Sequence, residues 1–304
     1  MKVLWQVARS VRAFGGRLAR GSGIGVAEAP EMGLALGGGF ARGIAHIGVL
    51  KVLEEAQIPV RFVAGTSVGA LIGAAYCSGL SVAEMEEMAS QVRSRHFAQW
   101  TISRLGLASN QRMGVFLHRI LKQKNFEDLK IPLAIAATDF VTGEGVAFRS
   151  GSLIDAVRAS CAYPGMFLPV EIGGRLLVDG MLAYPVPSVP LRAMGARRVL
   201  AISLKGGTNG AKPRHIFDVI GQSLNIALEH SAGIWRGASD LVVEPDTADF
   251  AYDDFARAGE LIRAGEVAMR QALPQVKSWF PAERPARQVL GSKAARVATE
   301  PSAS

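Results

Sequence analysis

Two stretches of the chain follow the same pattern and decide its fold class. Residues 32–56 read MGLALGGGFARGIAHIGVLKVLEEA, and residues 62–79 read FVAGTSVGALIGAAYCSG. Each begins with a short apolar run, passes through a glycine-containing turn and continues with helical spacing of apolar residues. Because strand, turn and helix follow one another twice, the pattern predicts βαβ units and a parallel sheet, which is an α/β fold.

The rest of the chain predicts more elements of the same kind. Residues 173–174 (Gly-Gly) indicate a two-residue hairpin, and Ser81 with Glu84 has the spacing of a helix capping box. Ser188 is expected to cap a short helix, and residues 96–126 are expected to form an insertion or lid over the sheet. We predict strands at 32–36, 62–64, 133–138, 145–149, 170–172, 175–178, 199–204 and 241–243, and helices at 42–56, 67–78, 114–122, 153–159, 216–236 and 254–273.

Composition limits the classes of protein to consider. The chain has 304 residues, of which 49% are hydrophobic, so it can build a large core without disulfides or structural metals. No stretch offers the roughly 20 consecutive apolar residues that span a bilayer. Cys77 and Cys161 lie in apolar surroundings without a CxxC pattern, which predicts buried, reduced thiols and a reducing, cytoplasmic location. The five histidines are scattered, so we expect no metal site and no cofactor.

The charge of the chain indicates an acidic partner. The formal net charge is +8, and no nucleic-acid-binding motif accompanies it, so an anionic membrane surface is the better hypothesis. Residues 1–30 are basic, with apolar residues on one side of a helical projection, and predict an interfacial amphipathic segment; a helix packed on its own domain or a loose tail are the alternatives. Residues 281–304 have the composition of a disordered tail, which leaves 31–280 as the catalytic domain.

Residues 65–69 (GTSVG) match the pattern G-x-S-x-G. A nucleophilic serine must project from a sharp turn between a strand and a helix, and small residues two positions before and after it relieve the crowding of that turn. An apolar strand precedes Ser67 and a helix of small residues follows it, as this motif requires. We therefore predict that Ser67 is a nucleophile; an ordinary strand-to-helix turn is the alternative.

Residues 37–43 (GGGFARG) form a second glycine turn between a strand and a helix. Such a turn lets backbone N–H groups converge on an anion, either a phosphate or the oxyanion of acyl transfer. The spacing does not match a dinucleotide-binding G-x-G-x-x-G, and no G-K-[ST] follows. Since both glycine turns follow neighbouring strands of a parallel sheet, they are expected to face each other at one edge.

A serine hydroxyl is a weak nucleophile unless a neighbouring base takes its proton. Asp179 follows a predicted strand, as does its rival Asp139, and either carboxylate would form a dyad with the serine. His215 and His230 are the alternatives for a triad, but both lie in or beside a predicted helix. We interpret His46, inside the first helix, as a packing residue.

Four blocks in order make this sequence resemble the patatin-like phospholipase family. Residues 37–43 (GGGFARG) are similar to the family's oxyanion loop, 65–69 (GTSVG) to its nucleophile elbow, 159–164 (ASCAYP) to its A-S-x-x-x-P block and 179–180 (DG) to the start of its D-G-[GA] motif. The sequence departs from the last motif at Met181, which could narrow the site. The resemblance extends over roughly residues 31–205.

The resemblance implies a three-layer α/β/α fold and a serine lipid acyl hydrolase that acts without metal or histidine. In that family's chemistry Asp179 would take the proton of Ser67, and the substrates would be phospholipids, lysophospholipids or neutral acyl esters. The implied oxyanion site comprises Gly37, Gly38, Gly39 and Arg42, with Arg42 bracing the loop or adding positive charge. The alternative is a regulatory or scaffold protein that keeps the fold with little turnover, for which Met181 is the hint.

Overall fold

The computed structural model describes residues 31–93, 97, 99–101, 103–204, 212 and 216–280. The predicted amphipathic segment 1–30, the predicted tail 281–304 and His215 lie outside the described residues.

A mixed sheet forms the centre of the described chain. Eight strands pair in the order β10-β9-β1-β2-β5-β8-β7, with β6 paired to β5. Strands β10, β9, β1, β2 and β5 are parallel, whereas β6, β7 and β8 run antiparallel to their partners. The strands are β1 (Met32–Leu36), β2 (Phe62–Thr66), β5 (Leu133–Asp139), β6 (Gly145–Phe148), β7 (Val170–Ile172), β8 (Arg175–Asp179), β9 (Arg198–Ile202) and β10 (Leu241–Val243).

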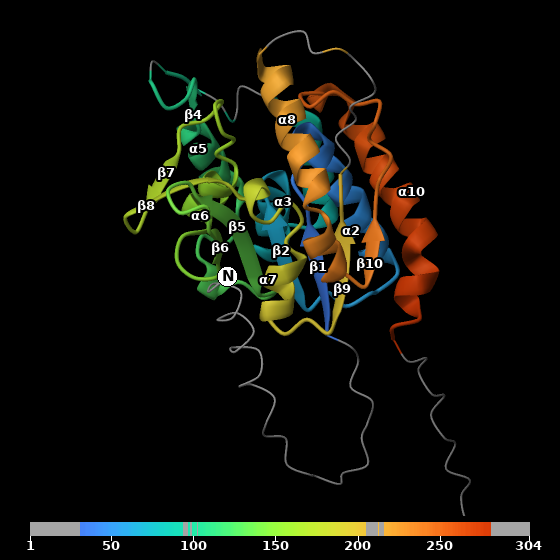
Figure 1. Cartoon of the computed structure of the whole chain (residues 1–304). Coiled ribbons are helices and arrows are strands. Elements are labelled where there is room, and N and C mark those ends of the chain that lie inside the picture. Colours follow the sequence, from blue (N-terminus) through green and yellow to red (C-terminus); the bar gives the residue numbers. More distant parts are fainter. Residues whose placement is uncertain are drawn as a thin grey trace, which may run out of the picture.

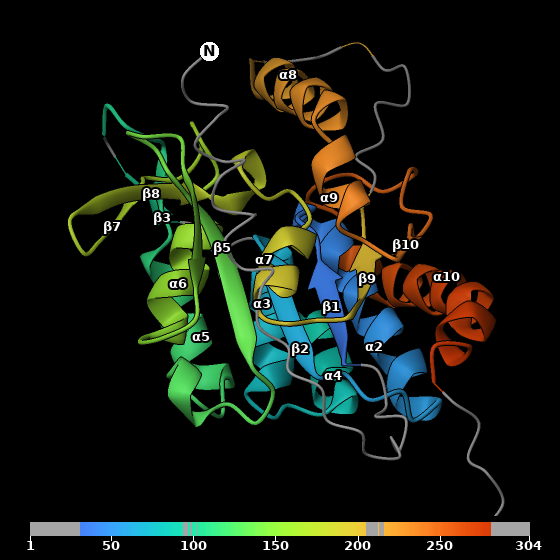
Figure 2. The same cartoon turned by 60° about the horizontal axis from the view of Figure 1, so that its bottom comes forward.

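Helices cover both faces of this sheet and complete three α/β/α layers (Figure 1, Figure 2). One face carries α2 (Ala45–Glu55), α3 (Val68–Cys77), α4 (Val82–Gln91), α5 (Gln111–Ile120), α6 (Leu153–Ser160) and α10 (Ala258–Lys277). The other face carries α7 (Ser188–Ala193) and α9 (Gly233–Gly237), and α8 (Ile216–His230) stands beyond α9. The three-layer fold that the resemblance implied is therefore confirmed.

The two faces of the sheet differ in side-chain size because side chains alternate along each strand. Leu34, Ile135 and Ile202 point into the larger core with α2, α3 and α10. The opposite face presents small side chains, namely Ala35, Ala64, Ala134 and Ala201. Leu191 of α7 and Trp235 of α9 pack against these alanines.

Most of the predicted elements are present, and the hairpin predicted at 173–174 is confirmed. Strand β6 pairs antiparallel with β5, and β7 pairs with β8 around Gly173 and Gly174, whose φ angles are 59° and 75°. The capping box at Ser81 is also confirmed, with both reciprocal hydrogen bonds to Glu84. Cys77 and Cys161 are buried and unpaired, as expected.

Two local predictions are wrong, and a third is narrowed. The helix expected over 216–236 is interrupted at 231–232 and forms α8 and α9. Ser188 is the first residue of α7 rather than its cap, and its hydroxyl is hydrogen-bonded to that of Ser239. The described residues of 96–126, expected to form an insertion or lid, contain a small sheet of β3 (Gln99–Trp100) and β4 (Ala108–Ser109) and the helix α5. Met113 and Leu117 anchor α5 in the main core, so this helix belongs to a layer and not to a lid.

Helices α2 and α10 approach each other through glycines. A Cβ atom added to Gly48 of α2 would lie 1.9 Å from the carbonyl oxygen of Ile262, and one added to Gly265 of α10 would lie 1.9 Å from that of Ala45. Both obstacles are backbone atoms, so neither helix can accept a side chain there without moving. This contact holds α10 against α2 in the helical layer that covers one face of the sheet.

We predict that Gly265→Ala destabilises the protein, since it forces α2 and α10 apart. The free energy of unfolding should fall by about 1–3 kcal/mol or more. Gly259→Ala in the same helix is the matched control, because open space surrounds its Cβ position and alanine favours the helix. Chemical denaturation of the two variants measures the difference, and equal stabilities would contradict the close packing.

Candidate active site

Ser67 occupies a strained turn between β2 and α3. Its φ of 54° and ψ of −124° are rarely adopted by a residue with a side chain. The flanking glycines are required by close contact, since a Cβ on Gly65 would lie 2.4 Å from the carbonyl oxygen of Gly69 and a Cβ on Gly69 would lie 2.1 Å from that of Leu36. The local structure is therefore that of a nucleophile elbow.

Two hydrogen bonds hold Ser67 in this turn. Its hydroxyl donates to Oδ2 of Asp179 over 2.7 Å, and its backbone N–H donates to the hydroxyl oxygen of Ser160 over 2.8 Å. Ser160 is fully buried at the end of α6. Its contact with Ser67 was not anticipated from the sequence, although the block at 159–164 contains it.

Sheet register explains why Asp179 reaches Ser67. On β5, Ala136 pairs with Thr66 of β2, and the next residue, Ala137, pairs with Asp179 of β8. Strand β6 occupies the other edge of β5, so β8 continues along the edge that β2 has just left. The end of β8 therefore meets the turn that follows β2, and so Asp179 reaches Ser67 across 112 residues of sequence.

Asp179 is buried, with 1% of its surface exposed. Burial raises the pKa of its carboxyl group to about 7, although hydrogen bonds from the Met181 N–H and the Ser67 hydroxyl act in the opposite direction. The backbone of Met181 thus supports the carboxylate at 2.9 Å, while its side chain lines the cleft in front of it. At neutral pH the group titrates between its acid and carboxylate forms.

The glycine turn at 37–39 lies against the elbow. A Cβ added to Gly38 would lie 3.4 Å from Cβ of Ser67. The N–H of Gly37 donates to the carbonyl of Ile202 over 3.0 Å, and that of Gly38 donates to the carbonyl of Pro185 over 3.2 Å. Within the described residues, no hydrogen bond uses the N–H of Gly39. The N–H groups of Gly37 and Gly38 are therefore already paired in this structure, and that of Gly37 is bonded to β9.

His46 stabilises this turn through a hydrogen bond to its backbone. It is fully buried in α2, and its Nε2 lies 2.9 Å from the carbonyl oxygen of Gly37. Burial lowers the pKa of His46 to about 4, so the ring is neutral at neutral pH. Since a carbonyl oxygen only accepts, Nε2 carries the proton and donates it; Nδ1 has no partner in the described structure. The packing interpretation of His46 therefore missed a specific contact with the glycine turn.

Arg42 lies at the edge of the same cleft. Its Nε donates to the carbonyl oxygen of Phe250 over 3.0 Å, and burial lowers the pKa of its guanidinium group. The Ala41 N–H donates to the carbonyl of Tyr252, so the glycine turn and the loop at 250–252 are tied together twice. The structure thus gives Arg42 a bracing contact.

Of the rival candidate bases, Asp139 and His230 are not hydrogen-bonded to Ser67, and His215 lies outside the described residues. Asp139 accepts hydrogen bonds from the N–H groups of Val141 and Thr142 and pairs with Arg175 over 3.9 Å, which are contacts of its own turn. His230 is exposed at the end of α8, where it lines the outer part of the cleft.

The cleft in front of Ser67 has a volume of about 880 Å³. Aromatic and aliphatic side chains line much of it, and α8 forms one wall. The lining includes Phe40, Tyr163, Met166, Met181, Leu204 and Ile226.

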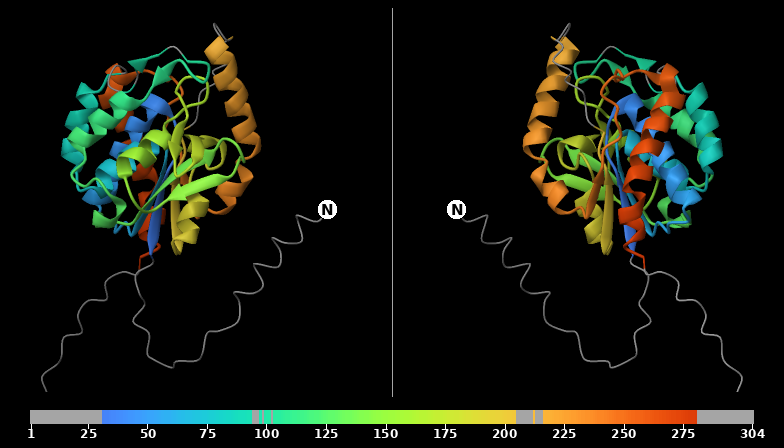
Figure 3. Two further views of the ribbon diagram at one scale, coloured as in Figure 1. Left: turned by 90° about the vertical axis from the view of Figure 1, so that its left-hand side faces the viewer. Right: turned by 90° about the vertical axis from the view of Figure 1, so that its right-hand side faces the viewer.

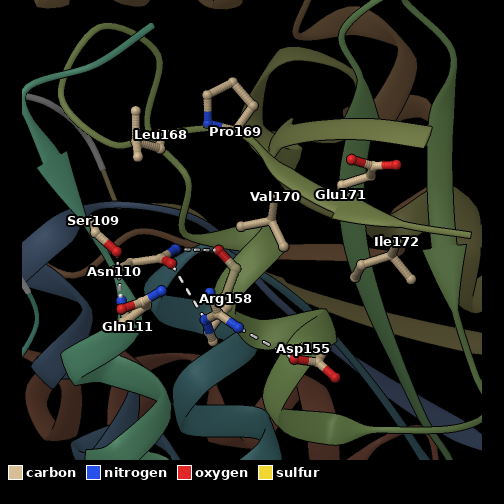
Figure 4. A pocket seen from close by; sticks show the side chains of 10 residues that line it. All are labelled: Ser109, Asn110, Gln111, Asp155, Arg158, Leu168, Pro169, Val170, Glu171 and Ile172. Carbon is tan, nitrogen blue, oxygen red and sulfur yellow. Dashed lines mark hydrogen bonds and ion pairs between the residues drawn. The ribbon is translucent and has the colours of Figure 1, made fainter. Parts of the chain in front are cut away.

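A second hollow of about 360 Å³ lies beside α5, α6 and β7 (Figure 4). Its polar side chains bond to one another: Arg158 donates to Asn110 and Asp155, and Asn110 donates back to the carbonyl of Arg158. These groups leave little unsatisfied polarity for a ligand, whereas the larger cleft contains the strained serine.

The fold and the elbow define an α/β/α protein with a serine–carboxylate pair at the carboxyl edge of its sheet. A family model described as patatin-like phospholipase matches residues 34–191. The chain belongs to this family.

Known proteins from several organisms are similar to this chain. An uncharacterized NTE family protein of Mycobacterium tuberculosis is 31% identical over 278 residues, which cover 87% of this chain and 76% of that protein. Lysophospholipase NTE1 of Mycosarcoma maydis is 33% identical over 229 residues, which cover 71% of this chain and 12% of that protein. Among solved structures, VipD from Legionella pneumophila aligns with a TM-score of 0.48 and 14% identity, over 82% of this chain and 67% of that one.

Within the described part of the chain, none of the helices combines the length and the apolarity required to cross a bilayer.

We predict that Asp179→Asn changes how stability depends on pH. The folded-state pKa of about 7 lies above the ordinary value of 3.8, so this group's contribution to stability is complete below pH 4 and is lost as pH rises towards 7. In the asparagine variant the free energy of unfolding should not show this decrease, which is about 2–4 kcal/mol in the wild type. Unfolding curves at pH 5 and pH 8 measure it; an identical decline in both proteins would contradict the raised pKa.

Proposed function

We propose that the chain is a serine lipid acyl hydrolase that cleaves carboxylic esters of the phospholipase A or lysophospholipase type. The observation that carries this proposal is the 2.7 Å hydrogen bond from the Ser67 hydroxyl to a buried carboxyl group whose pKa is about 7. A base with a pKa near the working pH suits general base catalysis. The family membership and the lysophospholipase among the relatives support the choice of lipid esters.

In the first half of the reaction, the oxygen of Ser67 attacks the ester carbonyl carbon and its proton passes to Oδ2 of Asp179. The carboxylate is the active form, and it dominates above pH 7. The Met181 N–H, bonded to Oδ1, holds the second oxygen and keeps the carboxylate oriented. The strained turn presents the serine oxygen to the cleft, so little motion is needed to reach a substrate.

The negative oxygen of the tetrahedral intermediate needs donors that are already in place. We assign this role to the N–H of Gly39, which has no partner in the described structure, with the N–H of Gly38 beside it. The Gly38 N–H makes a hydrogen bond of 3.2 Å to Pro185, which it would share or exchange. The amino-terminal end of α3 adds a positive helix-dipole end at the same place.

The first half ends when Asp179 gives the proton to the leaving alcohol as the ester C–O bond breaks, which leaves an acyl-serine. In the second half Asp179 takes a proton from a water molecule, whose oxygen attacks the acyl carbonyl carbon. The bond between the acyl group and the Ser67 oxygen then breaks, Asp179 returns the proton to that oxygen, and the acid is released. Two groups therefore suffice for both halves, and no metal step is required in this scheme. The acyl chain would lie along the apolar lining of the cleft, against side chains such as Phe40 and Met166.

The regulatory alternative rested on Met181, which stands where the family pattern has a small residue. In the structure the backbone of Met181 makes the supporting bond to Asp179, so its side chain does not displace the carboxylate. The side chain instead narrows the cleft. This observation favours an effect on substrate choice over a loss of activity.

We predict that Ser67→Ala lowers hydrolysis by about 10³-fold or more, since the variant lacks the nucleophile. Release of fatty acid from lysophosphatidylcholine and hydrolysis of a soluble short-chain ester both measure it. The exposed Ser90→Ala is the matched control. Labelling by a fluorophosphonate should occur in the wild type and the control only. A folded wild type that is neither labelled nor active would support the regulatory alternative.

We predict that His46→Ala lowers kcat about tenfold or more with little change in KM, because the Gly37 carbonyl loses its donor and the oxyanion turn loosens. His46→Gln should retain most of the activity, since its amide supplies a donor at a similar reach. Steady-state kinetics beside thermal unfolding separates this effect from a loss of stability. A folded His46→Ala protein with wild-type kcat would contradict the bracing role.

A further inference from the structure

Exposed apolar side chains lie on two elements near the Ser67 cleft. On one side α8 exposes Ile216, Val219 and Ile226; on the other, the β3–β4 hairpin and its connecting loop expose Trp100, Leu105 and Leu107. We call these six side chains the apolar rim. Helix α8 and the hairpin stand at the same end of the molecule, where the parallel strands finish (Figure 1, Figure 3).

Helix α8 lacks the packing that usually stabilises an amphipathic helix. None of its described side chains is buried, although the helix has 15 residues. Ile216, Val219 and Ile226 fall on one side of it at 100° per residue. Ile226 also lines the cleft, so this apolar stripe begins at the cleft mouth and continues outwards.

The hairpin is hydrogen-bonded to a residue that lines the same cleft. The N–H groups of Leu107 and Ala108 both donate to the carbonyl of Met166, over 3.1 and 2.9 Å, and the Met166 side chain lines the cleft. Trp100 is nevertheless 80% exposed and Leu105 64% exposed. Large apolar groups held at this position in water are costly unless they contact another surface.

The composition of the rim indicates what that surface is. Two exposed cations flank its apolar side chains, Lys212 beside the cleft and Arg104 in the hairpin loop, and Asp218 and Glu229 of α8 also line the cleft. Tryptophan, aliphatic side chains and flanking cations together are the combination that favours the boundary between lipid headgroups and acyl chains. A phospholipid bilayer is therefore the partner that fits.

We propose that the apolar rim inserts into the surface of a phospholipid bilayer and places the cleft mouth against the membrane. This inference rests on the proposed function, because an enzyme for membrane lipids must receive its substrate from the bilayer. Docked in this way, an acyl chain passes from the membrane into the apolar cleft without crossing water. The rim also supplies the contact that the packing of α8 lacks.

The test is vesicle binding by the full-length chain in the Ser67→Ala background, which prevents turnover. Vesicles contain phosphatidylcholine with phosphatidylglycerol, and co-sedimentation gives the apparent Kd. Val219→Glu and Leu105→Glu should each weaken binding about tenfold or more, because each replaces an inserted aliphatic side chain by a charge. Val267→Glu is the matched control, since Val267 is 52% exposed on α10, away from the rim.

The same substitutions with Ser67 intact separate this inference from the proposed function. Val219→Glu and Leu105→Glu should hydrolyse a soluble short-chain ester at the wild-type rate and lose activity on vesicles. If the wild-type protein does not hydrolyse a soluble ester, the proposed chemistry is wrong. Vesicle binding then still tests the docking surface by itself. Unchanged vesicle binding in both variants would overturn the docking surface, as would dissociation of a dimer by Val219→Glu in the absence of lipid.

Discussion

The site depends on the way in which one edge of β5 is shared between two strands. Strand β2 pairs with the first part of that edge and β8 with the last part, in opposite directions. Ala136 and Ala137 are adjacent, so the residues opposite them, Thr66 and Asp179, are held side by side. The Ser67–Asp179 hydrogen bond follows from this register, and a shift of one residue would turn the carboxylate to the other face of the sheet.

Close packing around that contact explains the distribution of small residues. Gly65 allows the elbow to fold against the start of α3, and Gly69 allows it to approach the end of β1. Gly180 lies against the backbone of Ala136, where a Cβ would approach the carbonyl oxygen to 2.3 Å. The same compactness excludes water from Asp179 and raises the pKa of its carboxyl group. Burial thus makes the group a suitable base at neutral pH and also makes its ionisation costly for stability, a trade-off common at catalytic positions.

Rigidity and exposure are divided between two parts of the molecule. In the core, the buried His46 holds the glycine turn and the buried Ser160 holds the Ser67 backbone, each through one hydrogen bond. At the surface, α8 and the β3–β4 hairpin expose apolar side chains near the cleft. Precise positioning is needed where bonds would break, whereas the proposed contact with a bilayer needs area and charge, not exact geometry.

The sequence alone determined the α/β class, most of the strands, the elbow at Ser67 and the glycine turn, because glycine spacing and apolar periodicity are local properties. It left Asp139, Asp179 and the two later histidines open as bases, since only strand register brings one of them to the serine. The donor role of His46, the occupied N–H of Gly37 and the break between α8 and α9 also required the tertiary structure. In each case the partner is a backbone atom or a packing contact that no side-chain pattern encodes.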